Sequence, residues 1–359
     1  MKKAVLIINI AAFAVIIALT ITLLVRSSML PEQEAYKRWS ENNSKPFSLS
    51  DIFSKAKGIA AVPSAQISVF YKSGISLDNC YQMTFDLGEK TETYAKNIGG
   101  DAVASAFCTA PAKLPFTAKS DIGEKSANLE SYFVGGDFLL FHPYEILSGT
   151  FLSDDTIMHD NAVIDENAAW QLFGSNDVVG EYIFSNTTAI HISGVVKIPN
   201  AETGYIFLDK ELCATITGIP AQFNCFETIM PNPVTGSGLT VIKEMLGITD
   251  GNTSPDKSSK VVENSSRTTL PALFDILENI PEISVRDDAI ILPAWENRAR
   301  ERDTGSALIL FFLCVVVGIV LITDILPLIW LIRLIKKSIK RIYEKIVTPS
   351  GRKIKGENE

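Results

Sequence analysis

Residues that carry chemistry are scarce in this chain of 359 residues, which has only three histidines and five cysteines. His142, His159 and His191 do not form the HExxH or HxxxH spacing that places two zinc ligands on one face of a helix. No GxSxG sequence marks a serine nucleophile, no GxxxxGKS/T loop can cradle phosphates, and no CxxC pair marks a redox or zinc site. We therefore expect a protein that is not an enzyme and that uses no metal and no cofactor.

Long apolar runs are absent too, except in two blocks, Ala4–Val25 and Ala307–Ile332. The segment between them, residues 26–306, has the mixed composition of a globular protein. About 20 apolar residues are needed to cross a bilayer, so each block is long enough to do so. This layout excludes a purely soluble chain, a polytopic channel and a disordered polymer.

The first block follows Lys2 and Lys3, as the apolar part of a signal peptide would. Its uncharged run is longer than the roughly 7–15 apolar residues of a signal peptide, and no small-x-small cleavage site follows it. We expect residues 4–25 to be an uncleaved transmembrane helix, preceded by a cytoplasmic N-terminus of residues 1–3.

The second block, residues 307–332, is uncharged up to Thr323 and then contains Asp324 and Pro327. Asp324 is a candidate intramembrane acid, which would act in a relay or in a contact between helices. The alternative is an acid at the membrane interface, beside a proline that ends the helix. The sequence leaves both interpretations open.

The orientation follows from the basic residues. Residues 333–359 carry nine Lys and Arg against three Glu, and the other end adds Lys2 and Lys3. Because cytoplasmic segments are enriched in Lys and Arg, both ends are expected in the cytoplasm, with residues 26–306 outside a cell (plasma) membrane. The ends sum to +8, so the rest of the chain carries −16 to reach the net charge of −8. An acidic exterior argues against binding nucleic acid or anionic lipid from outside.

Four of the cysteines lie in the outer segment, where an oxidising compartment would permit disulfides. Sequence proximity favours Cys80–Cys108 and Cys213–Cys225, although three connectivities exist and free buried thiols remain an alternative. The fifth, Cys314, lies inside the second span.

The outer segment has short strand-like runs with helices between them, which is typical of an α+β fold. Polar, helix-compatible stalks are expected at residues 31–58 and 296–306, the second with a Glu296–Arg300 pair. Asp165 is expected to cap a helix over Glu166–Phe173, which Gly174 ends in a left-handed conformation. The other expected strands are Gln66–Tyr71, Tyr81–Phe85, Ala102–Cys108, Ala162–Ile164, Ile190–Val196, Tyr205–Leu208, Phe226–Met230 and Ile283–Val285, the other helices are Thr91–Ile98 and Leu270–Asn279, and residues 251–268 are a polar stretch.

The basic tail has an apolar stripe. Ile335, Ile339, Ile342 and Ile346 recur at spacings of four, three and four, and lysines and arginines occupy the other face. This pattern predicts a basic amphipathic helix. It would lie on the anionic inner leaflet, in contact with membrane lipid, or dock onto a cytoplasmic partner.

Residues 132–196 resemble the MacB-like periplasmic core domain of ABC transporter permeases. Six short blocks recur in the family's order: an aromatic-Gly run, a small-Gly-aromatic turn, a strand, a helix ending in Leu-Phe-Gly, a Val-Gly turn and a Gly-Val-Val strand. The matching residues are Tyr132–Phe141, Leu147–Phe151 with Asp154 and Asp155, Ala162–Asp165, Ala168–Gly174, Val178–Gly180 and Ile192–Val196, with Pro293–Asn297 ahead of the second span.

The resemblance implies a small α+β part with an inserted β-rich lobe, here held between two transmembrane helices. It also implies a cytoplasmic ABC ATPase as partner, and an outer domain that has no catalytic residues and relays ATP-driven motion to a substrate or an envelope partner. Family members normally have four membrane helices, and this chain supplies two, which makes it a reduced form and suggests a second permease subunit. The alternative function is a non-transport envelope sensor or regulator that binds a ligand through the outer domain.

Overall fold

The computed structural model describes residues 2–26, 30–37, 39, 64–98, 103–120, 123–153, 158–199, 201–280 and 290–347, with the backbone alone at 2–10, 31, 93–98, 324–332 and 341–347. The chain divides into two compact units. One, the outer unit, is Ser28–Thr304, and the other, the helical unit, combines Met1–Ser27 with Gly305–Glu359.

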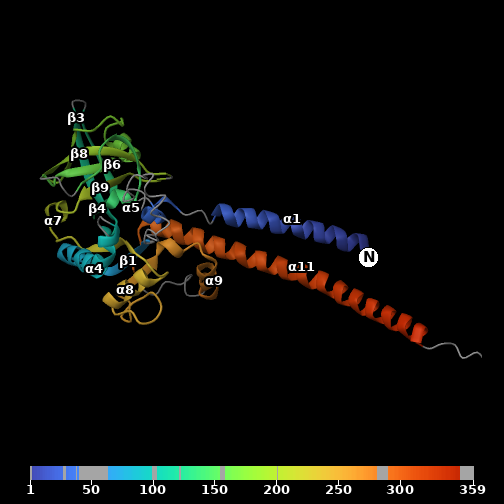
Figure 1. The fold of residues 1–359 in the computed structure, drawn as a ribbon. Coiled ribbons are helices and arrows are strands. Elements are labelled where there is room, and N and C mark those ends of the chain that lie inside the picture. Colours follow the sequence, from blue (N-terminus) through green and yellow to red (C-terminus); the bar gives the residue numbers. More distant parts are fainter. Residues whose placement is uncertain are drawn as a thin grey trace, which may run out of the picture. The chain divides into compact units, whose positions relative to one another are not determined.

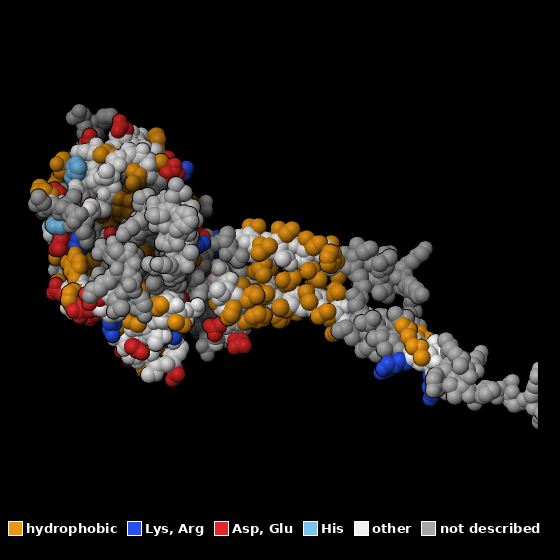
Figure 2. Space-filling view, viewed as in Figure 1, with side chains coloured by type: hydrophobic (Ala, Val, Ile, Leu, Met, Phe, Trp, Pro, Cys, Tyr) orange, Lys and Arg blue, Asp and Glu red, His pale blue; other side chains and the backbone are white. Residues whose placement is uncertain are grey.

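Two long helices supply the helical unit: α1 (Lys2–Arg26) and α11 (Ala294–Val347), whose first turns belong to the outer unit. Among the described residues, Ala294–Thr323 of α11 is long and apolar enough to cross a membrane, and Ala11–Arg26 of α1 forms a shorter apolar helix. Apolar side chains cover the visible surface of this part of the chain (Figure 2). The second expected span therefore has a matching helix, and the first stays a prediction.

Helix α11 continues through Asp324 and Pro327 to Val347, so the proline does not end the helix. The side chain of Asp324 lies outside the described residues, and its role as an intramembrane acid stays a prediction. The amphipathic tail is helical as expected, and Ile335 and Ile339 are exposed. The side chains of Ile342 and Ile346 lie outside the described residues.

A mixed sheet forms the outer unit, which is α+β as expected (Figure 1). Its strands run in the order β11-β1-β10-β2-β4-β3-β7-β8-β6-β9, with β5 paired to β8 and β9 also paired to β4. The strands are β1 (Ser64–Ile75), β2 (Ala104–Thr109), β3 (Ala112–Ser120), β4 (Gly123–Gly136), β5 (Glu145–Gly149), β6 (Asn161–Asp165), β7 (Tyr182–Ser185), β8 (Thr188–Lys197), β9 (Tyr205–Asp209), β10 (Phe223–Pro231) and β11 (Ser259–Glu263).

The segment inserted between β2 and β10 forms the β-rich lobe. Because β9 pairs in parallel with β4, the strands β4-β3-β7-β8-β6-β9 close into a ring. Helices α6 (Glu166–Leu172) and α7 (Leu212–Thr217) share one apolar cluster with these strands. Asp165 caps α6 as predicted, since its Oδ1 accepts a hydrogen bond from the backbone N–H of Ala168 at 2.9 Å. Gly174 has the predicted left-handed conformation, with φ of 74°.

The remaining strands, β11, β1, β10, β2 and the end of β4, have an apolar cluster on each face. Helices α4 (Leu77–Ile98) and α8 (Ser237–Met245) cover one face. The other face packs against the short helix α5 (Phe138–Phe141), the segment around Ala35 and the first turn of α11 at Trp295. Two further elements, η3 (Asn264–Ser266) and α9 (Leu270–Glu278), connect β11 toward α11.

Some sequence predictions were wrong. Tyr81–Phe85 is not a strand but part of α4, whose buried residues Cys80, Leu87 and Thr91 recur at a helical period. The polar stretch 251–268 contains the unpredicted strand β11. The expected strand Ile283–Val285 lies outside the described residues.

The two stalks also differ from expectation where they are described. Ala35, in the first, is fully buried in the apolar cluster on the face opposite α4 and α8. The second is helical and has the predicted Glu296–Arg300 pair at 2.7 Å, but Glu296 and Asp303 are buried rather than solvated. The helix enters the outer unit because its residues 295, 296, 299 and 303 share one inward face.

Candidate functional site

The candidate site in the described part of the outer unit lies at the first turns of α11, residues 294–303, which we call the base of α11. Its inward face presents Trp295, Glu296, Ala299 and Asp303, all buried. Facing them is Arg267, which follows η3. Two carboxylates and one guanidinium thus meet where the helix joins the domain.

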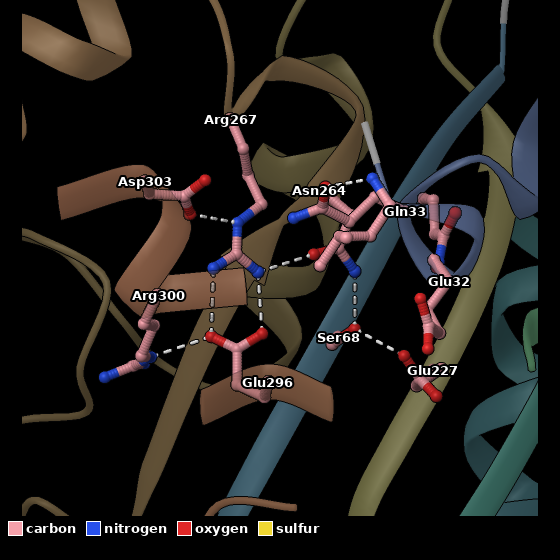
Figure 3. Close-up of polar contacts among 11 residues, drawn as sticks. Glu32, Gln33, Ser68, Glu227, Asn264, Arg267, Glu296, Arg300 and Asp303 are labelled. Atoms are coloured by element: carbon pink, nitrogen blue, oxygen red, sulfur yellow. Dashed lines mark hydrogen bonds and ion pairs between the residues drawn. The ribbon is translucent and has the colours of Figure 1, made fainter. Parts of the chain in front are cut away.

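Arg267 makes a hydrogen-bonded ion pair with each carboxylate (Figure 3). Its Nη1 donates to Glu296 Oε2 at 2.6 Å and its Nη2 to Glu296 Oε1 at 3.3 Å, while Nε donates to Asp303 Oδ2 at 2.7 Å. Arg300 Nε donates to Glu296 Oε1 at 2.7 Å. Burial by itself would lower the pKa of Arg267, but the charges of Glu296 and Asp303 raise it above its ordinary value, so the guanidinium stays charged.

From Arg267 a line of hydrogen bonds crosses the sheet. Arg267 Nη1 also donates to Asn264 Oδ1 at 2.9 Å, and Asn264 Nδ2 donates to Ser68 Oγ at 2.7 Å. Ser68 Oγ donates to Glu227 Oε1 at 2.9 Å, and Glu227 Oε2 lies 2.6 Å from His142 Nε2. We call this set the buried polar chain: His142, Glu227, Ser68, Asn264, Arg267, Glu296 and Asp303.

Strand register and short turns position these side chains. Ser68 of β1 and Glu227 of β10 are directly paired residues of antiparallel strands, so their side chains lie on the same face. Asn264 begins η3, straight after the edge strand β11, and its turn brings Arg267 back toward α11. His142 follows α5, where its backbone N–H donates to the carbonyl of Phe138.

Several buried polar atoms around this site have no hydrogen-bond partner among the described residues: His142 Nδ1, Trp295 Nε1, Gln33 Nε2 and Gln66 Oε1. The rings of His142 and Trp295 lie with their centroids 4.3 Å apart. An unsatisfied buried polar group costs about 1–3 kcal/mol. The base of α11 is therefore held by strong charge pairs, next to buried polar atoms that have no partner in the described part of the chain.

Every member of the buried polar chain is buried, so a dissolved substrate has no direct access to its carboxylates or to His142. The described residues include no cluster of three His, Cys, Asp or Glu placed to hold a metal ion. The expectation that the chain is not an enzyme stays a prediction.

The four outer cysteines are buried free thiols in the structure. Burial raises the pKa of Cys80 to about 12, with Cys108 as a second contribution. The residue pairs favoured by sequence proximity belong to different apolar clusters, since Cys80 is not in the cluster of Cys108 and Cys213 is not in the cluster of Cys225. Instead, Cys108 of β2 is directly paired with Cys225 of β10 in one cluster.

We expect that any disulfide formed by this chain joins Cys108 to Cys225. Directly opposed residues of antiparallel strands have Cα atoms about 4.5–5.5 Å apart, within the range that a disulfide spans. Peptide mapping of the alkylated, non-reduced protein would identify the linkage. A Cys80–Cys108 or Cys213–Cys225 peptide would contradict the expectation, and five alkylated cysteines would show that all thiols stay free.

Sequence reasoning missed most of this site. It singled out Glu296 and Arg300, but as part of a solvated stalk. It considered His142 only in the search for zinc-ligand spacings, and it did not single out Arg267, which lies in the stretch 251–268 described only as polar. The other two histidines lie apart from the buried polar chain: His159 Nδ1 is 3.2 Å from Asp209 Oδ2, and His191 Nδ1 is 3.1 Å from Asn161 Oδ1.

No family model matches this chain, and no curated protein matches it. Solved structures that resemble it include the extracellular domain of the noncanonic ABC-type transporter YknZ from Gram-positive bacteria, at 12% identity and a TM-score of 0.37, covering 55% of this chain and 99% of that one. Another is the periplasmic region of MacB from Actinobacillus actinomycetemcomitans, at 13% identity and a TM-score of 0.39, covering 63% of this chain and 97% of that one. These neighbours are outer domains of ABC-type transporters, the kind of domain that the sequence blocks resemble. No residue's role is taken from them.

Proposed function

We propose that this chain is a membrane subunit of an ABC-type export or mechanotransmission complex. In this proposal the outer unit relays ATPase-driven motion to an exported substrate or to an envelope partner. One observation carries it: α11 is a single helix whose first turns are buried in the outer unit through Arg267 and whose last turns carry the basic tail.

The buried polar chain gives this coupling a physical basis. Hydrogen bonds in which a partner is ionised are about twice as strong as neutral ones, and Arg267 makes three of them to two turns of α11. Through Asn264 and Ser68 it is linked to Glu227 on β10, the third strand from the β11 edge of the sheet. If α11 shifted, it would therefore pull on strands β1 and β10, and the helix would not slide past them.

Two buried atoms, Trp295 Nε1 and His142 Nδ1, have no hydrogen-bond partner among the described residues, and this favours movement of the base of α11. Each carries a desolvation cost that a second arrangement could remove by supplying a partner. Allosteric transitions use packed interfaces with two discrete arrangements, since cores are not continuously deformable. The base of α11 therefore has ion pairs that would transmit force. Next to them are buried polar atoms whose desolvation cost would favour a second arrangement.

The proposed partners are a cytoplasmic ABC ATPase, a second permease subunit and membrane lipid. In this proposal the amphipathic stripe at Ile335 and Ile339 contacts the ATPase, and the apolar spans contact the lipid. A second subunit would complete a membrane domain for which this chain supplies α1 and α11. Both termini would be cytoplasmic, because the basic residues concentrate there.

A photo-crosslinking experiment in intact cells tests this proposal. A photoreactive phenylalanine analogue at Ile339 should crosslink to a protein with a P-loop ATPase sequence, identified by mass spectrometry. The matched control carries the analogue at Lys337, which is also exposed but lies about 160° around the helix from Ile339. Crosslinking to the ATPase should be several-fold stronger from position 339 than from position 337.

Two results would contradict the proposal. Crosslinks to lipid alone from both positions would leave the tail on the membrane surface. Crosslinks to an envelope enzyme or a signalling protein, with no ATPase, would favour a sensor or regulator.

A further inference from the structure

From Arg267 to Glu227, the hydrogen bonds of the buried polar chain run in one direction (Figure 3). A guanidinium can only donate, so the Asn264 side chain turns its oxygen to Arg267 and its nitrogen to Ser68. The single hydroxyl hydrogen of Ser68 then goes to Glu227 Oε1. Accepting a hydrogen bond favours the ionised form of a carboxyl group. We therefore assign the hydrogen in the 2.6 Å contact between Glu227 and His142 to Nε2 of the imidazole.

The charges of the buried polar chain balance when His142 is an imidazolium. The two carboxylates on α11 are matched by Arg267 and Arg300. Glu227 accepts from the neutral hydroxyl of Ser68, and its other described partner is His142. Because a buried charge is costly unless it is paired, a proton on each nitrogen of His142 would stabilise the Glu227 carboxylate.

The elements packed around His142 carry other titratable groups. They are Cys225 on β10, Cys108 on β2, Tyr132 on β4, Tyr205 on β9, Glu32 and Tyr36 in and beside η1 (Pro31–Gln33), Asp137 and Tyr144 on either side of α5, and Glu296 and Arg298 on α11. Burial raises the pKa of Cys225, Tyr132 and Tyr144 above their ordinary values, so these groups stay neutral. Glu32 pairs with Arg298 at 3.3 Å. Of this set, His142 is the group placed to supply the counter-charge of Glu227.

His142 and Trp295 have complementary nitrogen atoms. Neither His142 Nδ1 nor Trp295 Nε1 has a hydrogen-bond partner among the described residues. The indole nitrogen can only donate, and Nδ1 of a neutral imidazole whose Nε2 carries the hydrogen can only accept. In an imidazolium both nitrogens donate. A hydrogen bond from Trp295 Nε1 to His142 Nδ1 therefore requires that His142 is neutral.

The observed arrangement fits the charged form of His142. The centroids of its ring and the Trp295 ring are 4.3 Å apart, with the ring planes at 51°. This is within the distance of about 6 Å at which an aromatic ring attracts a cation. An imidazolium would gain from this contact and from Glu227, whereas a neutral ring would gain more from a hydrogen bond to the indole.

We propose that a proton on His142 Nδ1 selects between two arrangements of the base of α11. With the proton, the imidazolium stays between Glu227 and Trp295, as in this structure. Without it, Nδ1 accepts a hydrogen bond from Trp295 Nε1, and the first turn of α11 shifts to make that bond. Histidine is the side chain that ordinarily changes charge between about pH 5 and 8, so acid around the outer unit favours the arrangement described here. The proposal concerns the outer unit alone and does not depend on an ATPase.

Tryptophan fluorescence of the full-length chain in detergent tests this switch. Trp39, Trp170 and Trp330 are replaced by phenylalanine, so that Trp295 is the reporter. An imidazolium in contact with an indole quenches its emission more strongly than a neutral imidazole does. The emission should therefore rise severalfold between about pH 5 and 8, in a single one-proton step.

His142→Gln separates the charge of the imidazole from its place in the packing. Glutamine cannot become a cation, but its amide nitrogen can donate to Glu227 and its oxygen can accept from Trp295. This variant should emit at the high level at every pH. His159→Gln is the matched control and should keep the pH step, because His159 pairs with Asp209 and lies apart from the buried polar chain.

The indole N–H resonance of Trp295 gives a second measurement, made on the native chain and assigned with Trp295→Phe. It should move downfield as the pH rises, because the N–H gains an acceptor. Three results would overturn the proposal: a Trp295 emission that does not change with pH, a pH step that persists in His142→Gln, or an indole resonance that shows no gain of a hydrogen bond at high pH. The resonance decides the matter if the substituted chains do not fold.

Discussion

Replacing Arg267 by alanine is expected to lower the free energy of unfolding of the outer unit by roughly 3–5 kcal/mol, because two buried carboxylates lose their counter-charge. Glu296 would keep only Arg300, and Asp303 would lose the ion pair to Arg267. Removing one partner of a buried pair costs more than removing the whole set, since the remaining charge stays in a low-dielectric site. Urea unfolding of the full-length chain in detergent, followed by tryptophan fluorescence, would measure the change.

The matched control is Arg298→Ala on the same helix. Arg298 pairs with Glu32 at 3.3 Å, but its side chain is 43% exposed. Exposed ion pairs contribute about 0–1 kcal/mol, so this variant should differ little from the native chain. Adding Glu296→Gln and Asp303→Asn to the Arg267→Ala chain should recover part of the loss. Equal effects of Arg267→Ala and Arg298→Ala would mean that the buried ion pairs do not hold the base of α11.

Gly136→Ala is expected to cost roughly 2–5 kcal/mol, from two additive causes. Gly136 has φ of 70°, and a side chain in this left-handed region costs about 1–2 kcal/mol. A Cβ there would also collide with the carbonyl oxygen of Ser105 on β2, and overpacking of this kind costs about 1–3 kcal/mol. The residue ends β4, directly before Asp137 and α5, and it is paired with Ala106 of β2.

Alanine substitutions at two other glycines would measure the conformational cost and the packing cost separately. Gly218 has φ of 74° but open space around it, so Gly218→Ala should show the conformational cost alone, about 1–2 kcal/mol. Gly135 has ordinary backbone angles, but its Cβ would collide with the Phe107 ring, so Gly135→Ala should show the packing cost alone. Thermal unfolding of the three variants side by side gives the comparison. If Gly136→Ala were no worse than Gly218→Ala, the close approach to β2 would not matter.

Features encoded within a few neighbouring residues could be predicted from the sequence. The Asp165 cap and the Gly174 terminus depend on local backbone hydrogen bonding, and both are present. Tyr81–Phe85 was misassigned because five residues cannot reveal a helical period, which becomes visible only over Cys80, Leu87 and Thr91. Strand β11 has little apolar content of its own, and it forms a strand because β1 offers an edge for it.

The buried polar chain could not be predicted in this way. Ser68, His142, Glu227 and Arg267 are separated by tens of residues or more. Ser68 and Glu227 meet because β1 pairs with β10, and Arg267 and His142 reach them from the ends of η3 and α5. The same holds for Cys108 and Cys225, which face each other across a strand pair although nearer cysteines exist along the chain. Nothing in the sequence around Arg267 reveals that its partners come from the base of a membrane helix.

Because α11 is long, a small tilt about one of its ends would displace the other end by a large distance. At 1.5 Å per residue its 54 residues make a rod about 80 Å long. If such a rod tilts by roughly 5° about one end, the other end moves by about 7 Å, more than one helical turn of 5.4 Å. The contacts of Arg267 lie near one end of this lever, where displacements are small and forces are large. A short and strong set of ion pairs suits that end, and the exposed Ile335 and Ile339 lie toward the other.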